Sequence, residues 1–138
     1  MAVAFKVTSV ERSGWAVLRV SGELDLMTSP TLRQRVHDAV AEGQHSLVLD
    51  LDAVFFCDSS GVGVLIATRR LMRSCRGRLR LILPARGADG TEARQSEADS
   101  GGSSHVNRVL AALGVRRLFD VYPDLDAALS EESSPLSA

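Results

Sequence analysis

The sequence predicts an α/β domain in which a mixed β-sheet of about five strands is flanked by about four helices. Two observations predict this fold class: two β-prone segments joined by a tight turn near the N-terminus, and helical and β-prone segments that alternate after them. The first pair forms an antiparallel hairpin, and each later strand-helix-strand succession connects parallel neighbours. A chain of 138 residues has the usual size of one domain, which we expect at residues 1–130, followed by a flexible tail at 131–138.

The hairpin leads directly into the first helix. Its strands are predicted at Phe5–Val10 and Trp15–Val20, with Gly14 in the turn. Ser29 is placed to cap the helix, and Pro30 fits the first helical position, where its missing N–H costs no hydrogen bond. Apolar residues then recur at helical spacing and define one buried face: Leu32, Val36, Ala39 and Val40.

Three more strands and three more helices complete the predicted fold. They are a strand at Leu47–Leu51, a helix from Ser59 to Arg76, a strand at Leu79–Leu83, a helix at His105–Leu113 capped by Ser104, a strand at Leu118–Val121 and a helix from Pro123 through Leu129. Residues 85–104 contain no large apolar side chain. Because such a segment buries too little surface to offset its ordering entropy, we predict a disordered insertion there.

Charge and composition exclude several classes of function. With 16 Lys and Arg against 17 Asp and Glu the formal charge is −1, so the broad positive field typical of nucleic-acid binding is missing. No apolar run has the length of a membrane span and no secretory signal pattern is present, which predicts a cytoplasmic protein with no membrane partner. The two cysteines and three histidines are too widely spaced for a redox pair or a metal site, so no metal or cofactor is expected.

Residues 58–63, Asp-Ser-Ser-Gly-Val-Gly, are the most informative stretch. A serine hydrolase would need the pattern Gly-x-Ser-x-Gly around its nucleophile, but the residue two positions before Ser59 is Cys57 and the residue two before Ser60 is Asp58. A phosphate-binding loop of the GxxxxGK[ST] type is missing as well. The stretch therefore favours neither hydrolysis nor nucleotide turnover.

A purely structural interpretation of this stretch is that Ser59 caps a helix and the glycines pack against a neighbouring strand. Glycine destabilises a helix by about 1 kcal/mol relative to alanine, so Gly61 and Gly63 need a compensating reason. Our interpretation is that they keep bulk away from an approaching surface.

Residues 58–65, DSSGVGVL, resemble the D-S-[ST]-G-[LV]-G signature of the anti-sigma factor antagonists, small STAS-domain proteins. Residues 21–33, SGELDLMTSPTLR, are similar to the other signature of that family, and residues 118–129, LFDVYPDLDAAL, resemble its final strand and helix. The resemblance covers residues 3–83 and 105–130 and implies the STAS fold, whereas the insertion at 85–104 departs from the family pattern.

In that family the serine directly after the aspartate is phosphorylated by a partner that is both anti-sigma factor and serine kinase, so the resemblance implies phosphorylation at Ser59. It further implies a partner-binding site formed by six residues, namely Asp25, Asp58, Ser59, Ser60, Gly61 and Gly63. The expected protein is a regulator and not an enzyme: the unphosphorylated form binds the anti-sigma factor and frees the sigma factor, phosphorylation releases the partner, and a phosphatase resets the switch. The alternative is a STAS scaffold or signalling module of a larger assembly that has no phosphorylation switch.

Overall fold

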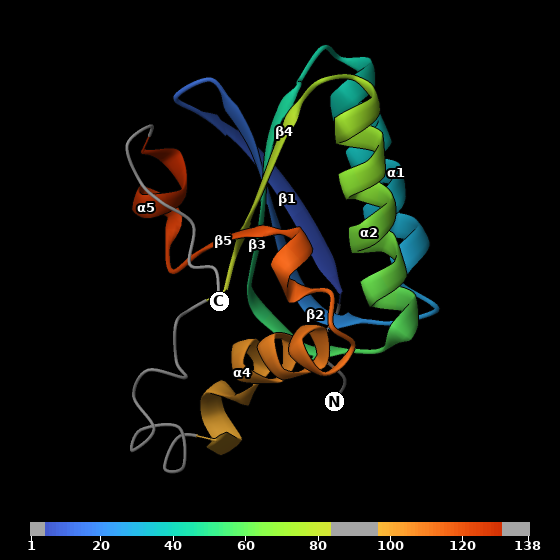
Figure 1. The fold of residues 1–138 in the computed structure, drawn as a ribbon, viewed down its shortest axis with the longest axis vertical. Coiled ribbons are helices and arrows are strands. Elements are labelled where there is room, and N and C mark those ends of the chain that lie inside the picture. The colour runs from blue at the N-terminus through green and yellow to red at the C-terminus, as the bar shows by residue number, and fades with distance from the viewer. Residues whose placement is uncertain (1–4, 84–96, 131–138) are drawn as a thin grey trace.

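The computed structural model describes residues 5–83 and 97–130, which form one five-stranded sheet with helices around it (Figure 1). The strands follow one another across the sheet in chain order: β1 (Lys6–Arg12), β2 (Trp15–Leu24), β3 (Ser46–Cys57), β4 (Arg78–Ile82) and β5 (Asp120–Tyr122). β1 and β2 pair antiparallel, and every later pair is parallel. The predicted mixed sheet is confirmed.

Helices provide the crossovers between the parallel strands. The helical segments are α1 (Ser29–Ala41), α2 (Ser59–Ser74), α4 (Glu97–Ala112), the 3-10 turn η2 (Arg116–Leu118) and α5 (Leu125–Leu129). α1 and α2 lie side by side on one face of the sheet and α5 lies on the other (Figure 1). α4 packs against the end of β3, where Nε2 of His105 lies 3.2 Å from the carbonyl oxygen of Cys57.

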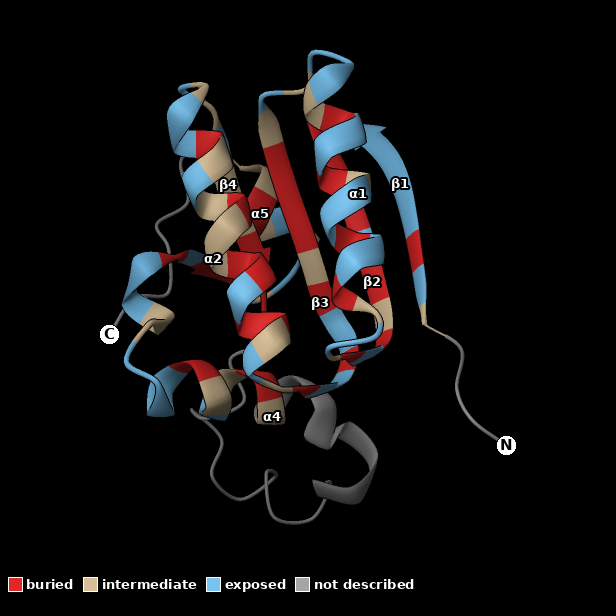
Figure 2. Ribbon diagram, turned by 90° about the vertical axis from the view of Figure 1, so that its right-hand side faces the viewer, coloured by how far each residue is buried: buried red, intermediate tan, exposed pale blue. Residues whose placement is uncertain are grey.

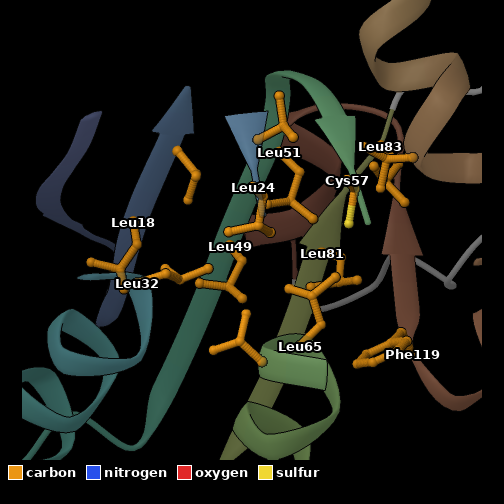
Figure 3. Packing of buried hydrophobic residues seen from close by; sticks show 14 of the residues in the cluster. Leu18, Leu24, Leu32, Leu49, Leu51, Cys57, Leu65, Leu81, Leu83 and Phe119 are labelled. Atoms are coloured by element: carbon orange, nitrogen blue, oxygen red, sulfur yellow. The ribbon is translucent and has the colours of Figure 1, made fainter. Parts of the chain in front are cut away.

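The larger core lies between the sheet and the pair of helices α1 and α2. Side chains alternate between the two faces of a strand, which brings Leu18 of β2 and Leu49 of β3 into this layer, both fully buried (Figure 3). In Figure 2, α1 and α2 each combine exposed and buried residues, as amphipathic helices on a sheet do. The helical face predicted for α1 is confirmed: Leu32, Val36 and Ala39 are buried, and Val40 is half-buried.

A smaller core on the opposite face lies under α5. Its buried members are Trp15, Val17, Val48, Ile82, Tyr122 and Ala128. The guanidinium of Arg80 lies 4.4 Å from the ring centre of Trp15 and 5.0 Å from that of Tyr122, and its Nη1 donates to the carbonyl oxygen of Ala128. Arg80 therefore covers the edge of this core and ties α5 to β4.

Two strands extend beyond their predicted ends. β2 continues to Leu24 and β3 to Cys57, because the two extensions pair with each other in parallel, with Leu24 opposite Cys57. The register shifts twice along this pair, at Arg19/Ser21 and at Gly22/Glu23, which is typical of β-bulges. Polar residues such as Asp52 interrupt the apolar pattern of β3, so alternation alone did not indicate the extension.

Three predicted caps are wrong. Ser29 is the first residue of α1, and its Oγ donates back to the carbonyl oxygen of Asp25 at 2.7 Å, while Thr28 occupies the cap position. Ser104 lies inside α4, which begins at Glu97. Ser59 is the first residue of α2, and the cap is the residue before it.

The C-terminal elements also begin later than predicted. Leu118 belongs to η2, so β5 comprises only Asp120–Tyr122. The last helix begins at Leu125 because the side chain of Asp124 accepts a hydrogen bond from the backbone N–H of Ala127 at 2.8 Å and caps it.

The predicted insertion and the predicted tail fall largely outside the described residues. Residues 84–96 and 131–138 are not described. The last part of the predicted disordered segment, residues 97–104, is helical and forms the beginning of α4.

Candidate functional site

The corner between β3 and α2 carries the DSSGVG stretch. Asp58 has an extended backbone, and its Oδ1 accepts a hydrogen bond from the backbone N–H of Gly61 at 3.0 Å. This is the geometry of an N-cap, which satisfies one of the unpaired amides of the first helical turn. Asp58 therefore has a structural role that the sequence analysis had considered for Ser59.

Ser59 is exposed at the first position of α2. Within the described part of the chain its hydroxyl forms no hydrogen bond, because Asp58 already caps the helix. Ser60 is half-buried. Of the two serines, Ser59 is the more exposed.

Replacing Asp58 tests the assignment of the cap. We expect Asp58→Ala to lower the free energy of unfolding by about 1 kcal/mol, the usual cost of losing an N-cap, and Ser59→Ala to leave it unchanged. Urea unfolding followed by circular dichroism measures both. The opposite ranking of the two variants would show that Ser59 is the cap.

The two glycines of the stretch have different environments. A Cβ added to Gly61 would lie 2.6 Å from the carbonyl oxygen of Leu24 and 2.7 Å from Sγ of Cys57, whereas a Cβ on Gly63 would meet nothing within 4 Å. Gly61 is buried and Gly63 is exposed. The structural interpretation thus accounts for Gly61, which lets α2 approach the end of β2, and only Gly63 leaves open space for an approaching surface.

Asp25 lies in the loop between β2 and α1 and organises it. Its Oδ1 accepts hydrogen bonds from the backbone N–H groups of Met27 at 3.0 Å and Thr28 at 3.1 Å, and its carbonyl oxygen accepts from Ser29. Thr28 in turn donates its hydroxyl to the carbonyl oxygen of Glu23 at 2.7 Å. The half-buried Asp25 thus has a structural role in this loop.

The same loop presents two large apolar side chains to solvent. Leu26 is 69% exposed and Met27 is 82% exposed, the highest values among the large hydrophobic residues whose side chains the structure describes. The loop is joined to the DSSGVG corner by a hydrogen bond from the backbone N–H of Asp58 to the carbonyl oxygen of Leu24. Two adjacent exposed apolar side chains make this loop a candidate contact surface for another protein.

The site also contains a residue pair that the sequence analysis did not identify. His105 at the middle of α4 stacks on Phe56 of β3, with ring centres 5.3 Å apart and an angle of 16° between the planes, and its Nε2 lies 3.2 Å from the carbonyl oxygen of Cys57. Phe56 is 39% exposed. No local pattern signals this contact, because 48 residues separate His105 from Cys57.

The chain segments that form the corner and the neighbouring loop carry acidic residues and no basic ones. Residues 20–32 and 46–68, which supply the two loops and β3, contain no Lys or Arg, and their acidic residues are Glu23, Asp25, Asp50, Asp52 and Asp58.

The thiol of Cys57, which precedes the DSSGVG stretch, is poorly ionised. Burial, and to a smaller extent the negative charge of Asp58, raise the pKa of the Cys57 thiol to about 12. Since only the thiolate is strongly nucleophilic, Cys57 stays neutral and inert beside the serines.

Two arrangements are common in enzymes, a serine paired with a histidine and a metal site. Within the part of the chain that the structure describes, neither Ser59 nor Ser60 forms a hydrogen bond with a histidine, as an activated serine nucleophile requires. Residues 5–83 and 97–130 contain no group of three or more His, Cys, Asp or Glu residues that could hold a metal ion. Within the same ranges, no helix is long and apolar enough to cross a membrane.

Comparison with known proteins assigns this fold and corner to a family. The STAS domain model matches residues 6–86, more than half of the chain, and the chain belongs to the STAS domain family. The chain is 42% identical over 62 residues to the anti-sigma-F factor antagonist RsfB of Mycobacterium tuberculosis, an alignment that covers 45% of this chain and 51% of RsfB. It thus spans about half the length of the curated relatives that it matches.

Two solved structures share the fold over most of the chain. An anti-sigma factor antagonist from Mycobacterium paratuberculosis superposes with a TM-score of 0.73 at 26% identity, covering 94% of this chain and 96% of the other. The phosphorylated form of the Bacillus cell fate determinant SpoIIAA superposes with a TM-score of 0.58 at 22% identity, covering 90% of this chain and 96% of the other. The second likeness shows the fold alone.

Proposed function

We propose that this chain is an anti-sigma factor antagonist: unphosphorylated, it binds an anti-sigma factor through the surface around Ser59 and thereby frees a sigma factor. The partner's own serine kinase activity phosphorylates Ser59 and ends the complex, and a phosphatase restores it. The protein itself catalyses no reaction. The names of the relatives, anti-sigma-F factor antagonist and anti-sigma factor antagonist, support the choice of partner.

One observation carries the proposal for Ser59. The hydroxyl is exposed and unbonded within the described residues, because Asp58 and not Ser59 caps α2. The first turn of a helix also tolerates negative charge, since its free N–H groups and the helix dipole favour an anion. A phosphate on Ser59 is therefore compatible with the folded domain.

Phosphate mapping tests the proposal directly. The anti-sigma factor, identified by co-purification, is incubated with ATP and the purified chain, and the modified peptide is sequenced by mass spectrometry. We expect one phosphate on Ser59, its loss in Ser59→Ala and its retention in Ser60→Ala, the matched control. A complex that forms but carries no phosphate would instead support a STAS scaffold without a switch.

The exposed pair Leu26 and Met27 gives a second test of the same surface. We expect the double variant Leu26→Ser/Met27→Ser to bind the anti-sigma factor about tenfold or more weakly, because both side chains lose apolar contact area in the complex. Isothermal titration calorimetry measures the change. The control is Leu113→Ser, which removes a 53% exposed leucine near the far end of α4 and should leave the affinity unchanged. Equal affinities for both variants would place the interface elsewhere.

A further inference from the structure

Six of the 16 basic residues of this chain fall within one short stretch of its sequence. Residues 69–80 contain six arginines and no acidic residue, although the whole chain has a formal charge of −1. Among the described residues no carboxylate lies within ion-pair distance of five of them, namely Arg69, Arg70, Arg73, Arg76 and Arg80. The segment comprises the second half of α2 and most of β4. The second half of α2, which contributes Arg69, Arg70 and Arg73, is therefore basic and carries no acidic residue of its own.

Part of this region lines a groove with a volume of about 310 Å³. Arg69 and Arg73 contribute from α2, four positions apart and hence on the same face of the helix. Leu118 and Phe119 line the other side, and Asp120 is the single acidic residue. The groove thus combines positive charge with an apolar wall.

Arg69 is held in position at this groove. Its Nε donates to the carbonyl oxygen of Leu118 at 2.8 Å, which fixes the guanidinium and leaves its two terminal nitrogens available. Arg73, one turn further along, is exposed, and its side chain forms no hydrogen bond within the described part of the chain. Guanidinium groups bind phosphate oxygens through paired N–H donors, and a fixed guanidinium loses little entropy on binding.

We propose that this groove is a binding site for a small phosphate-bearing anion, which Arg69 and Arg73 hold by hydrogen bonds and charge. Arg69 lies ten residues after Ser59 on the same helix, about 15 Å along its axis at 1.5 Å per residue. The site is therefore separate from the partner surface and independent of the proposed function. The chain binds this anion without the help of any other protein.

Nuclear magnetic resonance of the full chain tests the site, with inorganic phosphate as the probe and sodium chloride adjusted to keep the ionic strength constant. We expect saturable shifts of the backbone amides of residues 69–80 and 118–120 and none at residues 59–63. Pyrophosphate is titrated in parallel, and tighter binding of it would identify a diphosphate group as the preferred ligand. Shifts that rise without saturation, or that spread evenly over the chain, would overturn the proposal.

Substitutions of single and paired arginines test whether Arg69 and Arg73 form the site. Arg69→Gln/Arg73→Gln is expected to weaken phosphate binding about tenfold or more, and Arg33→Gln, which removes an exposed arginine of α1, is expected to leave it unchanged. If the double variant unfolds, Arg73→Gln alone is used, because the side chain of Arg73 makes no hydrogen bond among the described residues. Phosphate also stabilises folded proteins generally, because it is excluded from their surface. Binding at the site is therefore measured by the chemical shifts of the amides there and not by a change in melting temperature. Equal affinity in the wild type and Arg73→Gln would contradict the assignment.

Discussion

Phosphorylation of Ser59 is expected to weaken binding to the anti-sigma factor by about two to three orders of magnitude. The modification adds roughly −1.5 to −2 charges at pH 7 to a surface whose two supplying segments contain no Lys or Arg. In a complex this charge must lose water close to the Asp58 carboxylate. We expect a cost of roughly 3 to 4 kcal/mol, and each 1.4 kcal/mol corresponds to a tenfold change in affinity. Isothermal titration calorimetry with phosphorylated and unphosphorylated chain measures the ratio.

Single substitutions at Ser59 distinguish the effect of negative charge on the affinity from the effect of changing the side chain itself. Ser59→Ala should bind like the wild type and be insensitive to kinase and ATP, whereas Ser59→Asp should lose much of the affinity because it adds one negative charge. Without a partner, the wild type, Ser59→Ala and Ser59→Asp should unfold at nearly the same urea concentration, since the first turn of α2 accommodates negative charge. If the phosphorylated chain binds as tightly as the unphosphorylated one, Ser59 does not control the complex.

The second large expected effect is on stability. Gly61→Ala should lower the free energy of unfolding by about 1 to 3 kcal/mol, the range for overpacking a well-packed core. The new Cβ would lie 2.6 Å from the carbonyl oxygen of Leu24, a backbone atom that cannot turn aside. Gly61→Val, which is larger, should cost more. Urea unfolding monitored by the fluorescence of the buried Trp15 gives the free energy for each variant.

Gly63→Ala is the matched control, two residues further along the same helix. Nothing lies within 4 Å of a Cβ at Gly63, and alanine is favoured over glycine in a helix by up to about 1 kcal/mol. We therefore expect this variant to be equally or slightly more stable than the wild type, and any loss of partner binding in it would then report on the interface. A destabilised Gly63→Ala beside a stable Gly61→Ala would reverse our account of the two glycines.

Most of the fold could be predicted because its signals are local. The amphipathic spacing of Leu32, Val36 and Ala39 identified α1, and the alternation of helical and β-prone segments identified the parallel crossovers. Boundaries were less accurate where two residues compete for one role. Thr28 and Ser29 can both cap a helix, as can Asp58 and Ser59, and the backbone conformation of the corner decides between them.

The candidate site could be predicted only in part. The motif identified residues 58–63, but two of its residues have roles inside the fold: Asp58 caps α2 and Gly61 accommodates Leu24. The apolar pair Leu26 and Met27 is visible in the sequence, yet nothing there distinguishes it from core residues. Its exposure depends on how Asp25 turns the loop outward.

By itself the sequence determined the fold class, the order of the main elements and the position of the serine corner, because periodicity, turn residues and the spacing of a motif act over a few neighbouring residues. Only the tertiary structure decided which glycine is confined, which apolar residues reach solvent and which part of α4 lies beside the corner. Those outcomes depend on contacts such as Leu24 with Gly61 and Cys57 with His105, which join residues 37 and 48 positions apart. Packing of the whole sheet and its helices creates these contacts, and no local pattern encodes them.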